Sequence, residues 1–152
     1  MYLENSKTII VKIGSSLIID DKKIIRKKWL LEFTKDIKAL RKKNKNIIIV
    51  SSGAIALGCK KLNIAKKKLK IDQSQAVASV GQIELMNLFK EVFAIQKINI
   101  SQILLTLEDT EIRRRALNAK RTIENLFSLN FIYQFSIFMN FWIFCIKSIH
   151  IR

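Results

Sequence analysis

The chain has 152 residues, and 49% of them are hydrophobic, so it is long and apolar enough to bury the core of one ordinary domain and need not be disordered. Lys and Arg total 28 against 12 Asp and Glu, which gives a formal net charge of +16 at pH 7. Most of this excess is lysine on helix-like segments without the interleaved aromatic residues of single-strand binders, so we expect a solvated basic surface and no nucleic acid as a partner.

Two short apolar runs, Thr8 to Ile13 and Ile47 to Val50, predict strands buried on both faces, as in a parallel sheet that is covered by helices. Between them, apolar residues recur every three or four positions with lysines on the other face. This spacing predicts an amphipathic helix. The apolar positions are Ile25, Trp29, Phe33, Ile37 and Leu40.

The pattern continues with a predicted helix over residues 73–93 and a predicted strand over Ile100 to Thr106. Asp109 or Thr110 is then expected to cap another helix, because short polar side chains satisfy the free amides of a first turn. This alternation predicts a layered α/β fold with a mainly parallel sheet.

Leu126 to Ile146 differs from the rest, because it has no charged residue and is rich in phenylalanine. Its length approaches the roughly 20 residues of a membrane-spanning helix. Three interpretations remain: a membrane anchor, a buried core segment, or a stretch that selection never shaped. Interspersed Ser, Asn and Gln residues weaken the first, so we expect no membrane contact. The two cysteines, Cys59 and Cys145, suggest no disulfide framework, and the N-terminus shows no secretory signal, which favours the cytoplasm.

Small residues follow both predicted strands, Gly14 and Ser15 after the first and Ser51 to Ala54 after the second. Ligands of open parallel sheets bind at the carboxyl ends of strands, where small residues let backbone amides approach an anion. Lys12 lies within an apolar strand, where a charge is costly unless it meets a ligand, so it is the best candidate for contacting a phosphoryl group. The alternative is a pair of ordinary tight turns. Arg113 to Arg115 are either a phosphate clamp or a solvated helix face.

Five motifs occur in a familiar order: VKIGSS, IIIVSSGAIALG, QAVASVGQ, QILLT followed by Asp109, and RRALNAKRT. Together they resemble the glutamate 5-kinase branch of the amino acid kinase family, from about Lys7 to Phe131. The resemblance implies an incomplete three-layer α/β/α sandwich. It also implies transfer of the γ-phosphoryl group of ATP, with Mg²⁺, to the side-chain carboxylate of L-glutamate, the first step of proline biosynthesis, by a homo-oligomer in the full-length family.

The same resemblance assigns roles to six positions of this chain and assigns no metal ligand. Lys12 matches the catalytic and ATP-binding lysine. The glycine-rich turn over the ATP phosphates corresponds to Gly14 and Ser15, and the glutamate site corresponds to Ser52, Gly53 and Ala54.

After Phe131 the chain departs from the family pattern, so residues 1–131 are expected to form the amino-acid-substrate half of a kinase domain and residues 132–152 a divergent hydrophobic tail. The Asn- and Asp-rich loop that should hold glutamate has no counterpart, and neither has the nucleotide-binding half. A reading-frame change near Ile132 would explain the tail, and sequencing the gene through that point tests this hypothesis.

We expect the chain alone to be inactive. Two alternatives remain: the kinase portion of a bifunctional pyrroline-carboxylate synthase, and a non-enzymatic basic protein associated with a membrane.

Overall fold

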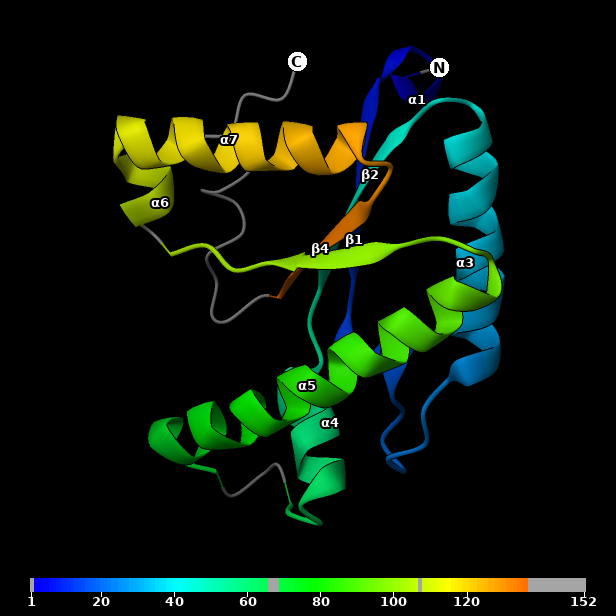
Figure 1. Cartoon of the computed structure of the whole chain (residues 1–152). Helices are drawn as coiled ribbons and strands as arrows, with labels where there is room; N and C mark the ends of the chain where they lie inside the picture. The colour runs from blue at the N-terminus through cyan, green and yellow to red at the C-terminus, as the bar shows by residue number, and fades with distance from the viewer. Residues whose placement is uncertain (1, 66–68, 107, 137–152) are drawn as a thin grey trace.

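The computed structural model describes residues 2–65, 69–106 and 108–136. Within these residues four strands form one parallel sheet, in the order β1-β2-β4-β3 (Figure 1). The strands are β1 (Thr8–Ile13), β2 (Asn46–Ser51), β3 (Ile100–Ile103) and β4 (Ile132–Ser136). The prediction of a parallel sheet is therefore confirmed.

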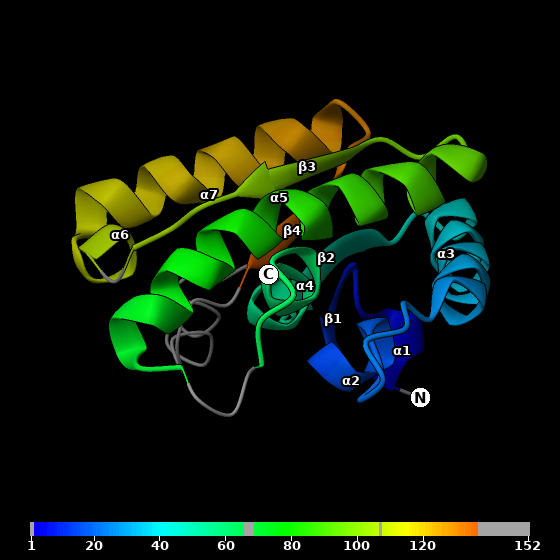
Figure 2. The ribbon, with the colours of Figure 1, turned by 90° about the horizontal axis from the view of Figure 1, so that it is seen from below.

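Helices cover both faces of this sheet. In Figure 2, α7 lies on one side of β3 and α5 on the other. The helices are α1 (Tyr2–Asn5), α2 (Ser15–Ile18), α3 (Lys27–Lys42), α4 (Ala54–Lys61), α5 (Ile71–Ile95), α6 (Glu108–Glu111) and α7 (Arg113–Ser128). The three-layer α/β/α arrangement is confirmed.

Two apolar clusters hold the layers together, one on each face. Ile47 and Ile49 of β2 pack with α3 and α5, for example against Phe89, in the larger cluster. Ile48 and Val50 of the same strand point the other way and join Ile123 of α7 in the smaller cluster. Because successive side chains of a strand alternate between faces, an unbroken apolar run such as β2 can serve both clusters.

The strands do not lie in the sheet in chain order. The connections from β1 to β2 and from β2 to β3 run through α3 and α5 on one face, whereas the return from β3 to β4 runs through α7 on the other. A right-handed crossover that reverses its direction along a sheet must use the opposite face. As a result β4 lies between β2 and β3 and becomes an interior strand.

The first strand is not buried on both faces as predicted. Ile9 and Ile13 belong to the core, but Ile10 is 36% exposed and Lys12 is exposed. Among the described elements, β1 is an edge strand, and no described helix covers its second face. The apolar run therefore reflects one covered face, and only β2 fits the original prediction.

The predicted start of the last helix is also wrong. The helix α7 begins at Arg113 with Ile112 at its N-cap and no side-chain cap hydrogen bond. Instead, the Asp109 carboxylate accepts hydrogen bonds from the Thr106 backbone N–H and hydroxyl, both at 2.7 Å, which lower the pKa of this carboxyl group. Asp109 thus lies within the short α6 and binds Thr106 just before that helix, and β3 ends at Ile103, before the predicted Thr106.

Part of the phenylalanine-rich segment, Ile132–Ser136, forms strand β4 of the sheet. Residues 132–134 of β4 are buried, and Tyr133 contacts Phe127 with ring centroids 5.0 Å apart. The buried interpretation is therefore confirmed for these residues, while residues 137–146 lie outside the described part. Within the described part, no helix is long and apolar enough to cross a membrane. The division of the chain at residue 131 stays a prediction.

Candidate active site

The carboxyl ends of β1 and β2 lie side by side. In the sheet register Lys12 is the neighbour of Val50, and Ile13 is the neighbour of Ser51. The Ser52 backbone N–H extends this pairing with a 3.1 Å hydrogen bond to the Ile13 carbonyl oxygen, and its hydroxyl donates to the same oxygen at 3.4 Å. Figure 1 shows both strands leading into α2 and α4 at one end of the sheet. The two small-residue loops therefore share an edge, as expected.

The second loop packs on the first at Gly53. Its φ of +128° lies in the region that glycine adopts readily and other residues rarely adopt. A Cβ atom at Gly53 would lie 3.4 Å from Ile18 Cδ1 and 3.8 Å from Ser15 Cα. Both distances are ordinary van der Waals contacts, so Gly53 is required by its backbone conformation and not by lack of space.

Gly14 differs from Gly53, because its backbone conformation does not require a glycine. Its backbone is extended, with φ −73° and ψ 153°. An added Cβ would have only Ser16 Oγ nearby, at 3.9 Å. The space beside this backbone is open, so an incoming anion could approach it closely.

Lys12 lies at this edge, but not for the reason inferred from the sequence. Neighbours in a parallel pair point to the same face, so Lys12 shares the face of Val50, where β1 has no described cover. Its side chain is exposed, so the argument that a buried ammonium must meet a ligand is wrong. What the structure supports is its position, one residue before the end of β1.

The first turn of α4 provides free backbone donors next to Ser52. Gly53 is the N-cap and gives no side-chain cap, and the first intrahelical bond runs from Leu57 N–H to the Gly53 carbonyl oxygen at 2.9 Å. The amides of residues 54–56 therefore have no acceptor within the helix. The positive end of a helix dipole favours an anion at such a position.

Two further glycines allow α4 and α5 to approach each other closely. A Cβ on Gly81 of α5 would lie 1.7 Å from the Ala54 carbonyl oxygen and 2.5 Å from the Gly58 backbone nitrogen. A Cβ on Gly58 would lie 2.1 Å from the Val77 carbonyl oxygen. The two helices thus touch backbone to backbone, and α5 holds the start of α4 in place. Sequence reasoning used Gly58 and Gly81 only as motif letters and missed this contact.

A buried polar pair stands directly before the Ser52 loop. Gln134 of β4 donates from Nε2 to Ser51 Oγ at 2.6 Å, and both residues are fully buried. This hydrogen bond links β4 to the end of β2. Sequence reasoning missed it because Gln134 lies in the tail, which was expected to have no counterpart in the family.

The three arginines of the proposed clamp begin α7 and are exposed. Arg115 Nη1 pairs with Glu108 Oε2 at 2.5 Å, and its side chain is 46% exposed. These observations favour a solvated helix face.

Comparison with known proteins gives consistent relatives. A family model described as the amino acid kinase family matches residues 7–139. The chain is 75% identical over 132 residues to a glutamate 5-kinase of Pelagibacter ubique (strain HTCC1062), covering 87% of this chain and 36% of that protein. It is 44% identical over 128 residues to a glutamate 5-kinase of Ruegeria sp. (strain TM1040), covering 84% of this chain and 35% of that protein. The chain therefore spans about a third of the length of these relatives.

Two solved structures share the fold at low sequence identity. Giardia carbamate kinase superposes with a TM-score of 0.55 at 8% identity, covering 86% of this chain and 59% of that chain. A T. acidophilum isopentenyl phosphate kinase product complex gives a TM-score of 0.56 at 10% identity, covering 88% and 57%. The resemblance drawn from the motifs and the α/β fold are both confirmed.

Proposed function

The chain belongs to the amino acid kinase family, and on that premise we propose that its described part forms the amino-acid-substrate half of a glutamate 5-kinase. The reaction would move the γ-phosphoryl group of ATP to the side-chain carboxylate of L-glutamate. The observation that carries the proposal is the Ser52-to-Ile13 hydrogen bond, because it holds the Ser52 loop against the end of the strand that bears Lys12.

Each side of this edge suits one reactant. The acceptor carboxylate would lie at the start of α4, where the Ser52 hydroxyl and the free first-turn amides can donate to it. The transferring phosphoryl group would lie at the end of β1, against Lys12 and the open backbone of Gly14 and Ser15. Phosphoryl transfer requires alignment and stabilisation of the charge on the equatorial oxygens, and little covalent help.

Lys12 has the role of a mobile positive charge in this proposal. A lysine ammonium on an exposed strand face can follow the phosphoryl oxygens as the bond to the leaving phosphate lengthens, and its charge then offsets theirs. The backbone amides act as fixed donors. The two kinds of donor together favour the transition state over the bound reactants.

Mg²⁺ enters this proposal only through the nucleotide. Among residues 2–65, 69–106 and 108–136, no three His, Cys, Asp or Glu side chains cluster in a way that could hold a metal ion. These residues therefore do not fit Mg²⁺ as a set of direct ligands, and none is assigned to it. In kinases the ion is bound in large part by phosphate oxygens and keeps several waters.

The same proposal extends to the setting of the reaction. It is the first step of proline biosynthesis, it takes place in the cytoplasm, and the complete enzyme is a homo-oligomer. These points extend what the motif resemblance implies, and the similarity to glutamate 5-kinases supports the kinase reaction on which they depend.

Replacing Ser52 with alanine tests the acceptor side. The variant is best made in a chimera in which residues 7–131 of this chain replace the matching segment of the Pelagibacter ubique glutamate 5-kinase, since the two are 75% identical over 132 residues. We expect the KM for L-glutamate to rise about tenfold or more, because a hydrogen bond to a charged group contributes ~1.5–3 kcal/mol. Hydroxamate formation at varied glutamate measures it.

The control for this variant is Ser79→Ala in the same chimera. Ser79 is exposed on α5, and its hydroxyl donates only to the Ala76 carbonyl oxygen of its own helix. Its KM for glutamate should stay within about twofold of the parent, and the KM for ATP should change little in either variant. An unchanged KM for glutamate in Ser52→Ala would remove Ser52 from the acceptor site.

A further inference from the structure

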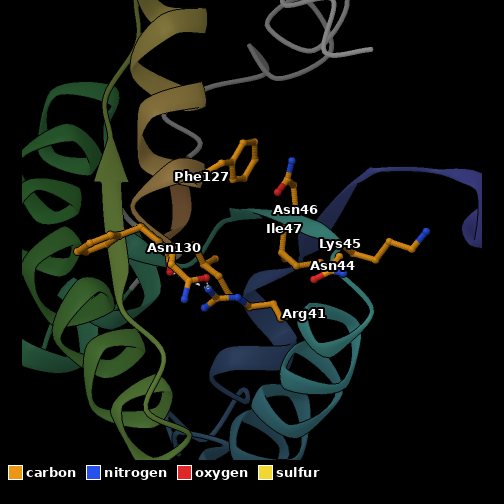
Figure 3. Close-up of a pocket in the computed structure, with 9 residues that line it drawn as sticks. Arg41, Asn44, Lys45, Asn46, Ile47, Phe127 and Asn130 are labelled. Atoms are coloured by element: carbon orange, nitrogen blue, oxygen red, sulfur yellow. Dashed lines mark hydrogen bonds between the residues drawn. The ribbon is translucent and has the colours of Figure 1, made fainter.

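A second hollow lies at the opposite end of the sheet from Lys12 and Ser52. It is a cavity of about 270 Å³ between the C-terminal turn of α3, the start of β2 and the turn from α7 into β4 (Figure 3). Asn46, which lines it, is the first residue of β2, whereas Ser51 is the last. The cavity is therefore separate from the proposed kinase site.

The described side chains that line the cavity include positive charges and no negative ones. Arg41 and Lys45 supply positive charge, Asn46 and Asn130 supply carboxamides, and the residues that line it within the described part include no Asp or Glu. Figure 3 shows the Arg41 guanidinium turned toward Asn130, while the Lys45 side chain extends the other way. Lys45 donates to the backbone carbonyl oxygens of Glu4 and Ser6, at 2.5 and 2.8 Å. Lys45 therefore contributes to the positive electrostatic potential of the cavity more than to direct contacts with a ligand.

Arg41 carries an uncompensated charge in this setting. Its Nη2 donates to the Asn130 carbonyl oxygen at 2.7 Å and to the Asn130 side-chain oxygen, both neutral acceptors. Within the described residues it forms no ion pair, and partial burial lowers the pKa of its guanidinium. A guanidinium has five donors in a fork that matches phosphate and carboxylate oxygens, so Nη1 and Nε remain to be used.

The remaining wall is aromatic. Phe127 and Phe131 also line the cavity, and the Phe127 ring contacts Tyr133 with ring centroids 5.0 Å apart. Figure 3 shows the Phe127 ring across the cavity from the Arg41 guanidinium. The volume lies near the lower limit of typical ligand pockets, which excludes large cofactors. A small ligand with an oxyanion at one end and a flat apolar group at the other would use both the guanidinium and the rings.

We propose that this cavity is a binding site for a small phosphate monoester with a flat apolar group, its phosphate held by Arg41 and its ring placed against Phe127. The site goes beyond the proposed kinase function and does not depend on it. The competing view is that Arg41 has only a structural role and holds the turn between α7 and β4 through the Asn130 carbonyl oxygen.

The test is a titration of phenyl phosphate into the full 152-residue chain, followed by calorimetry at constant ionic strength, with inorganic phosphate and phenol as parallel probes. We expect saturable binding of phenyl phosphate, weaker binding of inorganic phosphate and none of phenol. Absence of saturable binding would overturn the proposal. Equal binding of inorganic phosphate and phenyl phosphate would overturn the assignment of an ester.

The decisive variant is Asn130→Asp, which places a carboxylate against Arg41 and so competes with the phosphate. Asp fits the left-handed backbone of Asn130, whose φ is 64°, so the fold should be retained. Binding of phenyl phosphate should weaken at least about tenfold. Arg114→Gln makes the same change of one unit in net charge at an exposed position of α7, and Lys12→Met removes the phosphate contact of the proposed kinase site.

Arg114→Gln should bind phenyl phosphate within about twofold of the parent chain, because Arg114 does not line the cavity. Lys12→Met serves to report any binding of the phosphate at the proposed kinase site. If Arg114→Gln and Asn130→Asp lost the same affinity for phenyl phosphate, the binding would arise from general attraction to a chain of net charge +16. That result would overturn the proposed site. A loss in Lys12→Met but not in Asn130→Asp would place the bound phosphate at the other end of the sheet and also overturn it.

Discussion

Alanine at Gly81 is expected to destabilise the chain by about 3 kcal/mol or more, at or above the upper end of typical overpacking costs. The added Cβ would lie 1.7 Å from the Ala54 carbonyl oxygen and 2.5 Å from the Gly58 backbone nitrogen. Both neighbours are backbone atoms, so no side-chain rotation can relieve the contact. The two helices must separate, and the start of α4 must move away from the Ser52 loop. Urea unfolding followed by circular dichroism measures the loss.

The matched control is Gly14→Ala. Its added Cβ would meet only Ser16 Oγ at 3.9 Å, and its φ of −73° suits any residue. We expect its stability to stay within about 0.5 kcal/mol of the parent, or to rise slightly because the unfolded chain loses freedom. If Gly81→Ala unfolds at the same urea concentration as the parent chain, the backbone contact between α4 and α5 is not as close as described.

Methionine at Lys12, in the chimera defined above, is expected to lower kcat about 10²–10³-fold, the range seen when one preorganised donor to a developing anion is removed. Methionine keeps much of the length of the lysine side chain without its charge, and the exposed position leaves folding unaffected. The KM for glutamate should change much less than kcat, because the proposal puts the acceptor at the start of α4 and not against Lys12. Hydroxamate formation at saturating substrates measures kcat.

Lys7→Met provides the comparison for this variant. Lys7 is also exposed, but it precedes β1 and lies at the other end of the strand, away from Ser52. Its kcat should remain within about twofold of the parent chimera. If Lys12→Met retained the parental kcat, the charge at the end of β1 would play no part in phosphoryl transfer.

The sheet and its helices were predictable where periodicity is strong. β1 matches its predicted bounds, and β2 extends one residue beyond each end of its predicted run. The placement of Lys12 and Ser52 at the same end of the sheet also followed from the sequence, because parallel strands joined by a helix bring their carboxyl ends together. These features depend on the local spacing of apolar residues, and few other arrangements of strands and helices would bury those residues.

Other features were not predictable, because they depend on contacts between distant segments. An apolar run has the same appearance whether one or both faces are covered, so the exposure of Lys12 was missed. The sequence predicts Asp109 as a cap of the last helix, but Asp109 lies in the short α6, where Thr106, three residues earlier, donates two hydrogen bonds to it. The interior place of β4 could not be read from a segment that lacks the family motif.

The central claim is that Lys12 and Ser52 face one pocket that receives L-glutamate and the phosphoryl group. Titration of L-glutamate into the ¹⁵N-labelled 152-residue chain, with D-glutamate as control, tests the acceptor side directly through backbone amide resonances. The account predicts that the resonances of Ser52, Gly53 and Ala54 shift together with that of Gly14 on the neighbouring strand end, and that D-glutamate shifts them less. Unmoved resonances at these four positions, or shifts only around Arg41 and Asn130, would contradict it.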